Sequence, residues 1–284
     1  PVRPGGNTAG RHVPANTAHR ERVVPAARGL TFAQFRSTRN SDIAGAAGTA
    51  VWAYHFRTMI EPSTPSNRHL FGVATANTSR LVLASGSPRR AEILSSVGLI
   101  ADVRPTETPE HRLPGDGSPE EWSQRLASEK AANAALESPH AMILGADTIV
   151  VIDGEVLGKP SSPEEAEATL HRLSNRSHHV ITAVALDGVA GSYSGWSSTD
   201  VWIRDLEDRE IAEYVASGLC LDKAGSYGIQ DRPFEPAERI SGCYLNVVGL
   251  PVCLTAELFA LAGRPLDVEC DNCSEPDNTI SERP

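Results

Sequence analysis

The chain has 284 residues, a formal net charge of −10 and 40% hydrophobic residues, which is enough for one large domain or two lobes around a buried core. The acidic balance argues against a general nucleic-acid-binding protein, because such a protein needs a net basic surface. No run approaches about 18 consecutive apolar residues, so the sequence predicts no transmembrane helix and no membrane partner.

The five cysteines are an odd number without a regular framework, which favours reduced thiols in a cytoplasmic protein. Cys270 and Cys273 form one Cys-x-x-Cys pair in a polar region. Structural zinc requires four ligands, and because no second pair lies nearby we do not expect a zinc site there.

Residues 1–78 are rich in Ala, Thr, Pro, Arg and Asn and show no sustained periodicity. Residues 1–58 contain eight arginines but only two acidic residues, Glu21 and Asp42. Three interpretations are open: a disordered extension, an arginine-rich targeting peptide, and translated sequence upstream of a start site at or after Met59. We expect a disordered or non-native extension that takes no part in the fold.

The first ordered element is predicted at residues 81–84, which are apolar and indicate a short buried strand before a Ser-Gly-Ser turn. Ser87 fits a helix N-cap, and Pro88 fits the first helical position, where its missing N–H costs nothing. The predicted helix continues to about Val97 and ends at Gly98.

The charge at this helix start is unusual, because a helix N-terminus favours acidic residues and here Arg89 and Arg90 follow at once. Two further Ser-Pro openings, at Ser118 and Ser162, each continue with two glutamates. An anion, most commonly phosphate, would balance the first helix start. The alternative is that both arginines are solvated surface residues.

Between this helix and residue 264 the sequence predicts irregularly alternating strands and helices, with Asp153 and Gly154 as a strong hairpin signal. We predict an α/β fold with a mixed sheet and helices on its faces. Residues 265–284 are polar and predict a disordered tail. The further helices are predicted over 119–136, 163–173, 206–217 and 250–262, and the further strands over 100–103, 142–144, 149–152, 155–157, 179–186, 196–203, 224–229 and 244–248.

Three carboxylates are candidates for chemistry. Asp147 lies between two predicted strands, where small neighbours leave room for a ligand, although a structurally capped carboxylate is the alternative. Glu107 and Glu110 lie in an irregular acidic loop, and with Asp147 they could hold Mg²⁺, which binds through few carboxylates and several waters. Solvated loop charges are the alternative for the two glutamates.

Lysine is rare in this chain, which contains only three. Lys159 and Lys223 both follow turns, from which a flexible amine could reach a phosphate. The adjacent His178 and His179 face opposite sides of a predicted strand, so we do not expect the pair to bind a metal.

Five short motifs occur in order between residues 80 and 262, and together they resemble the Maf family of nucleoside triphosphate pyrophosphatases. The resemblance says nothing about residues 1–78 or the tail. The motifs are Leu83-Ala84-Ser85-Gly86-Ser87-Pro88-Arg89-Arg90; Ser128-Glu129-Lys130-Ala131; Gly145-Ala146-Asp147-Thr148 with Gly158-Lys159-Pro160; Asp222-Lys223-Ala224-Gly225-Ser226-Tyr227-Gly228-Ile229-Gln230; and Val247-Val248-Gly249-Leu250-Pro251.

The resemblance implies hydrolysis of a nucleoside triphosphate to the monophosphate and pyrophosphate, with a divalent metal, Mg²⁺ or Mn²⁺. It implies a two-lobed, mixed-sheet α/β fold like that of Maf and inosine triphosphatase proteins, with a central cleft. It also implies a homodimer, since family members often form one. The expected catalytic domain is residues 79–264.

The resemblance also implies roles for individual residues. Asp147 is the implied general base that activates water, and with Glu110 it would hold the metal, although Glu107 could fill the latter role because the acidic loop is variable. The residues implied to bind phosphate are Ser85, Arg89, Arg90, Lys130 and Lys159.

Within the family, the chain resembles the subgroup that cleaves dTTP and UTP rather than the one that acts on 7-methyl-GTP, because Arg89, Thr148 and Gln230 stand at the positions implied to set specificity. The Gln230 amide offers a donor and an acceptor, which matches the O4 and N3–H edge of uracil and thymine. Modified pyrimidine nucleotides are further candidate substrates. The alternatives are a non-catalytic nucleotide-binding regulator of cell division or septum formation, and a general phosphatase that releases orthophosphate.

Overall fold

The computed structural model describes residues 80–268 and 279–283. The predicted N-terminal extension, residues 1–78, and the Cys270–Cys273 pair lie outside the described residues. No helix in the described part is long and apolar enough to cross a membrane.

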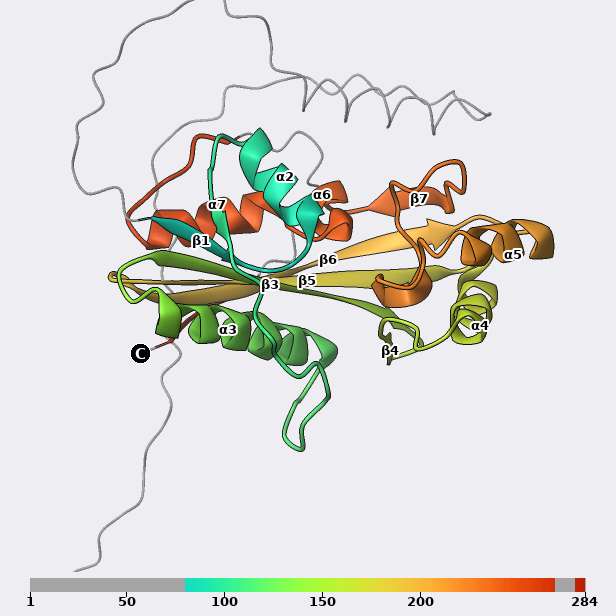
Figure 1. Cartoon of the computed structure of the whole chain (residues 1–284), viewed down its shortest axis with the longest axis horizontal. Coiled ribbons are helices and arrows are strands. Elements are labelled where there is room, and N and C mark those ends of the chain that lie inside the picture. Colours follow the sequence, from blue (N-terminus) through green and yellow to red (C-terminus); the bar gives the residue numbers. More distant parts are fainter. Residues whose placement is uncertain (1–79, 269–278, 284) are drawn as a thin grey trace, which may run out of the picture. The chain divides into compact units, whose positions relative to one another are not determined.

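The strands of the described residues form one mixed, eight-stranded sheet (Figure 1). Its main path is β2-β1-β3-β5-β6-β7, in which β1 is parallel to β2 and β3 and the other pairs are antiparallel. In addition, β4 pairs with β3, and β8 pairs with β6. The strands are β1 (Leu81–Ala84), β2 (Asp102–Val103), β3 (Met142–Ile152), β4 (Glu155–Leu157), β5 (Ser177–Gly188), β6 (Gly191–Ile203), β7 (Ala237–Ser241) and β8 (Thr279–Arg283).

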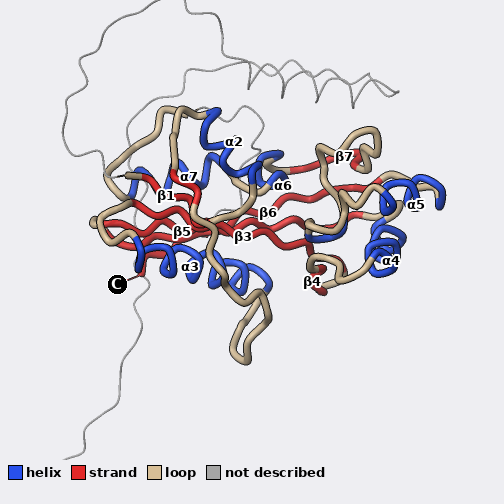
Figure 2. Tube along the Cα trace, in the orientation of Figure 1, coloured by secondary structure: helices blue, strands red, loops and turns tan. Residues whose placement is uncertain are grey.

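Helices cover both faces of the sheet, which confirms the predicted α/β class (Figure 2). Helix α3 packs on β1, β3 and β5 from one side, and α2, α6 and α7 lie on the other side. The described helices are α2 (Pro88–Ser96), α3 (Pro119–Glu137), α4 (Pro163–Leu173), α5 (Asp208–Ala216), α6 (Tyr244–Val248) and α7 (Val252–Leu261), with the short 3₁₀ helix η1 (Ala224–Ser226).

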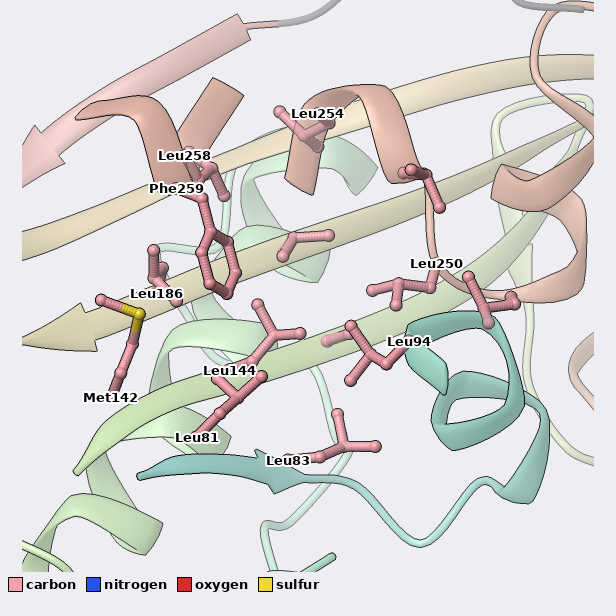
Figure 3. Packing of buried hydrophobic residues seen from close by; sticks show 14 of the residues in the cluster. Leu81, Leu83, Leu94, Met142, Leu144, Leu186, Leu250, Leu254, Leu258 and Phe259 are labelled. Atoms are coloured by element: carbon pink, nitrogen blue, oxygen red, sulfur yellow. The ribbon is translucent and has the colours of Figure 1, made fainter. Parts of the chain in front are cut away.

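The largest apolar cluster fills the space between the sheet and helices α2 and α7 (Figure 3). Full burial of one such side chain contributes about 1.5–3 kcal/mol, so this cluster fixes α2 and the turn that precedes it against the end of β1. Its labelled members are Leu81, Leu83, Leu94, Met142, Leu144, Leu186, Leu250, Leu254, Leu258 and Phe259.

Several predictions from local pattern are confirmed. Helix α4 has the predicted bounds, and α2 and α3 agree with the prediction to within one residue. The Asp153-Gly154 hairpin is present, with both residues in the left-handed region that a tight two-residue turn requires.

The prediction of two strands around Asp147 is wrong, because β3 runs without a break from Met142 to Ile152. The small residue Gly145 does not interrupt the strand to leave room for a ligand. A Cβ atom there would lie 2.2 Å from the Ala127 carbonyl oxygen, so the glycine lets the backbone of α3 approach the sheet. The close approach places α3 directly over the middle of β3.

Two predicted strands near the C-terminal end of the domain are also wrong. Residues 224–229 contain η1 instead, because Gly225 and Ser226 have left-handed backbone angles and Gly225 donates its N–H to the Gly158 carbonyl. Residues 244–248 form helix α6. There the buried Asn246 amide donates to Val180 O and Thr199 Oγ1, which are partners that only the folded sheet supplies.

The two ends of the sheet differ from prediction as well. Only residues 102–103 of the predicted strand 100–103 pair with β1. The predicted disordered tail, 265–284, contains the strand β8, whose residues 279–283 pair with β6 from Ser192 to Trp196.

Candidate active site

A cavity of about 450 Å³ lies beside the turn after β1, the middle of β3 and the segment 222–231. Its volume falls within the range of small-molecule binding sites, about 300–1,000 Å³. The cavity brings together all of the site residues predicted from the sequence, namely Ser85, Arg89, Arg90, Glu110, Lys130, Asp147, Thr148, Lys159 and Gln230.

The turn after β1 and the start of α2 form one wall of this pocket. Ser87 occupies the N-cap position but makes no side-chain capping bond, and no acidic residue lies in the first turn. Instead Ser85 Oγ accepts a hydrogen bond from the Ser87 N–H at 3.3 Å. Arg89 makes no hydrogen bond to any other described residue, so its guanidinium is available to a ligand in the pocket.

Arg90 differs from its neighbour, because its guanidinium is buried and faces protein atoms. Its Nε donates to Gly249 O at 2.8 Å, and Nη1 donates to both Ser85 Oγ and Ala146 O at 2.8 and 2.9 Å. Its Nη2 donates to Thr148 Oγ1 at 2.9 Å, which leaves one of the five N–H groups for a ligand. Arg90 therefore ties the turn, β3 and the loop after α6 together around the pocket.

Burial lowers the pKa of Arg90, although the negative charges of Asp147 and Glu110 act in the opposite direction. The guanidinium remains a cation at neutral pH, because its ordinary pKa is so high. The positive charge of Arg90 partly balances the negative charges of Asp147 and Glu110 within the pocket.

Asp147 and Lys130 form the buried ion pair at the centre of the site. Because side chains alternate along a strand, Asp147 lies on the same face of β3 as Gly145, the face that α3 covers. Lys130 of α3 donates to Asp147 Oδ1 at 2.7 Å and to Glu110 Oε1 at 2.8 Å. The Ser123 hydroxyl also donates to the Asp147 backbone carbonyl at 3.3 Å, which links α3 to the same residue.

The acidic loop supplies Glu110 rather than Glu107 to this pocket, because Glu110 is the one that lines it. Lys159 donates to Glu110 Oε2 at 3.2 Å, so the carboxylate bridges two lysines. Burial favours the neutral carboxyl group, but the hydrogen bonds and charges of Lys130 and Lys159 outweigh burial and lower the pKa of Glu110.

Thr148, on the opposite face of β3 from Asp147, belongs to a chain of hydroxyl groups. Thr182 Oγ1 donates to Asn246 O at 2.8 Å and lies 2.9 Å from Thr148 Oγ1. Since the only proton of the Thr182 hydroxyl is engaged, Thr148 is the donor between the two threonines, and it accepts from Arg90. The Thr148 hydroxyl is therefore fixed in orientation.

Another part of the pocket wall contains Gln230 and Lys223 with several apolar side chains. Lys223 donates to Asp222 Oδ1 at 2.8 Å and lies 3.4 Å from Asp231 Oδ2. The sequence indicated that Lys223 follows a turn from which its amine could reach a phosphate, but Lys223 was not among the residues implied to bind phosphate. The rarity of lysine was the signal for it, because all three lysines of the chain, Lys130, Lys159 and Lys223, line this one cavity.

The apolar part of that wall includes Tyr227, whose hydroxyl lies 2.7 Å from Nε2 of the buried His178. Burial lowers the pKa of His178 to about 4, so its ring is neutral at pH 7. His179 faces the other way and pairs with Asp200. The two histidines therefore have separate partners, as the strand alternation predicts. The apolar lining residues are Val150, Val180, Tyr227, Ile229, Val247 and Val248.

The donor set fits a hard divalent cation that shares its ligands with a substrate. The described residues contain no cluster of three or more His, Cys, Asp or Glu side chains suited to hold a metal alone. Glu110 and Asp147 are nevertheless held within reach of one ammonium group, Lys130 Nζ. Mg²⁺ and Mn²⁺ commonly bind through one or two carboxylates together with substrate phosphate oxygens and water, and this pair is suited to that role.

The site therefore combines a buried carboxylate, cationic side chains and apolar side chains in one cavity. The cationic groups that line it are Arg89, Arg90, Lys130, Lys159 and Lys223. Such an arrangement attracts a polyanion and stabilises negative charge that develops on it, while the buried carboxylate of Asp147 can accept a proton.

Comparison with known proteins agrees with this chemistry. Residues 80–262, which include the whole pocket, match the family model described as "Maf-like protein". The chain belongs to the Maf family. It is 46% identical over 181 residues to a protein of Geobacter metallireducens named "dTTP/UTP pyrophosphatase", a match that covers 63% of this chain and 94% of the relative.

Two further relatives of this Maf protein carry the same name. That of Symbiobacterium thermophilum is 46% identical over 187 residues, which are 66% of this chain and 96% of the relative. That of Syntrophomonas wolfei is 44% identical over 183 residues, 64% of this chain and 96% of the relative. The Maf region of the chain thus spans nearly the full length of these proteins.

Proposed function

We propose that this Maf protein is a nucleoside triphosphate pyrophosphatase that hydrolyses dTTP and UTP to the monophosphate and pyrophosphate. The observation that carries the proposal is the convergence of Asp147 with five cationic side chains in one cavity. The shared name of three relatives at 44–46% identity supports the choice of substrate.

Asp147 acts as the general base in this proposal. Its carboxylate accepts a proton from the attacking water as the water oxygen forms a bond to the α-phosphorus. The bond between the α-phosphorus and the oxygen that bridges it to the β-phosphorus then breaks, and the electron pair leaves with pyrophosphate. Lys130, which holds Asp147 Oδ1 at 2.7 Å, fixes the orientation of the base.

The cationic side chains have two tasks in the reaction. They offset the repulsion between a triphosphate of about four negative charges and an incoming nucleophile, and they stabilise charge on the departing pyrophosphate. We propose that Arg89, Lys159 and the N–H groups at the start of α2 contact the phosphates directly. Ser85 and Arg90 support the wall, with one Arg90 N–H directed to the ligand.

Glu110 and Asp147 would hold the divalent metal, Mg²⁺ or Mn²⁺. When bound, the metal supplies a Lewis acid that polarises the phosphoryl group and neutralises phosphate charge. Lys130 and Lys159 hydrogen-bond Glu110 and keep its carboxylate ionised, which is the form that binds a cation.

The base of the nucleotide would lie against the apolar wall beside Gln230. A primary amide can pair with both O4 and N3–H of uracil or thymine, whereas cytosine and adenine carry an amino group and an unprotonated ring nitrogen at the corresponding edge. The Gln230 amide also hydrogen-bonds Tyr244, where it opposes the rise in the tyrosine pKa that burial causes. Modified pyrimidine triphosphates with the same edge are candidate substrates.

The decisive experiment measures pyrophosphate and orthophosphate separately from a panel of nucleoside triphosphates, with Mg²⁺, with Mn²⁺ and with a chelator. We expect pyrophosphate from dTTP and UTP, metal dependence and little turnover of purine nucleotides. Nucleotide binding without product would instead identify a non-catalytic regulator, for example of cell division or septum formation. Orthophosphate as the first product would identify a general phosphatase.

Membership of the Maf family also suggests how the pocket is placed in the fold and how the protein assembles. We propose that the pocket lies in the central cleft of a two-lobed fold, and that residues 79–264 form the catalytic domain. We further propose a cytoplasmic protein that acts on free nucleotides rather than nucleic acid or membranes, and that assembles as a homodimer, which measurement of the mass in solution would test.

A further inference from the structure

Gln230 is part of a tight turn, Gly228–Asp231, at the edge of the pocket. The Asp231 N–H donates to the Gly228 carbonyl at 3.1 Å, which closes the turn with Ile229 and Gln230 as its central residues. The turn therefore sets the point from which the Gln230 side chain leaves the backbone, and the hydrogen bond with Tyr244 holds the amide at its other end.

One hydroxyl group outside the pocket holds both ends. Tyr214 OH donates to Asp231 Oδ2 at 2.6 Å and accepts from the Gly228 N–H at 3.1 Å. Tyr214 belongs to α5 and is buried, and its ring stacks on Phe234 with centroids 3.9 Å apart and an interplanar angle of 8°. The position of the hydroxyl is thus fixed by the burial of the ring and by its stacking on Phe234, which lies in the next turn of the chain.

The Asp231 carboxylate is folded back over the turn. A Cβ atom on Gly228 would lie 2.5–2.7 Å from its three carboxylate atoms, so only glycine leaves room for this arrangement. Lys223 Nζ lies 3.4 Å from the same Oδ2 atom and offsets its charge. The ammonium group of Lys223 therefore reduces the repulsion that the Asp231 carboxylate would exert on a phosphate in the pocket.

The donor in this clamp remains protonated under working conditions. Burial raises the pKa of Tyr214 above its ordinary value, and the hydrogen bond to the Asp231 carboxylate raises it further. The hydroxyl can therefore donate to Asp231 throughout the neutral range.

We infer that Tyr214 is a positioning residue for pyrimidine selectivity, because its hydroxyl fixes the 228–231 turn and thereby directs the Gln230 amide at the base. This inference rests on the proposed function of the pocket. Tyr214 itself does not line the pocket and touches no reacting group. Its loss should affect how well bases are distinguished rather than the chemistry at the α-phosphorus.

The test replaces Tyr214→Phe, which removes the hydroxyl and keeps the ring on Phe234. We expect the ratio of kcat/KM for UTP over ATP to fall about 10-fold, mainly through KM for UTP, because both hydrogen bonds of the hydroxyl to the turn are lost. The kcat for UTP should stay within about 2-fold of the wild type. Gln230→Ala removes the amide altogether, so the fall in the UTP/ATP ratio that it causes is the largest fall expected from losing amide recognition.

The matched control is Tyr193→Phe, which removes a phenolic hydroxyl that donates to Ala190 O at 3.2 Å in another part of the sheet. It should leave selectivity unchanged. A second variant, Gly228→Ala, leaves Tyr214 itself in place but displaces the Asp231 carboxylate to which its hydroxyl donates, and it should reduce selectivity in the same direction. It keeps the inference testable if Tyr214→Phe folds poorly.

Three results would overturn the inference: unchanged selectivity in both variants, an equal loss of kcat for all nucleotides, or the same change in Tyr193→Phe. The rise in melting temperature caused by non-hydrolysable UTP and ATP analogues provides a readout that does not need turnover. If the wild type released no pyrophosphate but bound the UTP analogue selectively, the proposed reaction would fail while the role of Tyr214 could still be measured.

Discussion

The start of α2 and the starts of α3 and α4 have the same Ser-Pro opening but opposite surroundings. In α3 and α4 the N-cap serines, Ser118 and Ser162, accept hydrogen bonds from backbone N–H groups three residues later, and glutamates follow. In α2 the N-cap Ser87 makes no such bond, and arginines follow.

In two of these helix starts the N-terminal backbone N–H groups and the positive end of the helix dipole are stabilised by side chains of the helix itself, whereas the start of α2 has no such side chains. The α3 start also has a reciprocal capping box, in which Glu121 accepts from the Ser118 N–H at 2.9 Å. The α2 start instead presents its N–H groups and Arg89 to a cavity shared with Lys130 and Asp147. An anionic ligand would supply the negative charge and the hydrogen-bond acceptors that this helix start lacks.

The largest expected effect tests whether this open helix start serves a reaction rather than binding alone. Asp147→Asn should lower kcat for dTTP by about 10²- to 10⁴-fold, because the amide cannot accept the proton of the attacking water. Nucleotide should still raise the melting temperature. The measurement is pyrophosphate release together with thermal unfolding at several nucleotide concentrations.

A suitable control for this variant is Asp200→Asn. It removes the negative charge beside His179 on the same sheet, outside the pocket, and should leave turnover unchanged. Wild-type turnover in Asp147→Asn would show that another group is the base.

A smaller effect, on nucleotide affinity, is expected when the basic residue at the start of α2 is replaced by an acidic one like those at the starts of α3 and α4. Arg89→Glu makes the α2 start resemble the other two, and nucleotide affinity should fall about 10- to 100-fold, since a hydrogen bond to a charged group is worth about 1.5–3 kcal/mol. The free energy of unfolding without ligand should be unchanged or higher, because an acidic residue suits a helix N-terminus.

The reverse exchange, Glu120→Arg in α3, supplies the matched control. It should lower the free energy of unfolding by about 0.3–1 kcal/mol and leave nucleotide affinity unaltered. Calorimetric titration of a non-hydrolysable nucleotide and chemical denaturation distinguish the two variants. Equal effects of both on affinity would mean that overall charge, rather than the α2 start, attracts the ligand.

The smallest effect concerns the caps themselves. Ser118→Ala should lower the free energy of unfolding by about 1 kcal/mol, because it removes an N-cap hydrogen bond. Ser87→Ala should cost only a few tenths of a kcal/mol, since no capping bond is lost. Urea denaturation of both variants without nucleotide is the measurement, and equal costs would contradict the distinction between the helix starts.

Much of the fold could be predicted because its signals are local. The N-caps, the Asp153-Gly154 turn and the bounds of α4 depend on contacts within about one helical turn or one hairpin. The candidate phosphate site is local too, because the Ser-Gly-Ser turn, the helix start and the two arginines that indicate it are adjacent in the sequence.

Other features could not be predicted, because their partners lie far away in the sequence. Asn246 fixes α6 through Val180 and Thr199, although the segment is apolar enough to resemble a strand. Arg90 directly follows Arg89 in the sequence, but only the packed chain shows that four of its N–H groups donate to protein atoms, among them the carbonyl of Gly249, 159 residues away. The choice of Glu110 over Glu107 likewise depends on where α3 places Lys130.

The sequence by itself therefore determined which residues carry charge, which segments could become helices, and that one helix start lacks its own acidic cap. Tertiary structure alone decided which cations line the pocket, that Asp147 stands in the middle of an unbroken strand, and that Tyr214 hydrogen-bonds both ends of the Gln230 turn. The physical reason is range: capping and turn formation are completed by near neighbours, whereas buried polar groups must find partners that only the packed chain brings within hydrogen-bond distance.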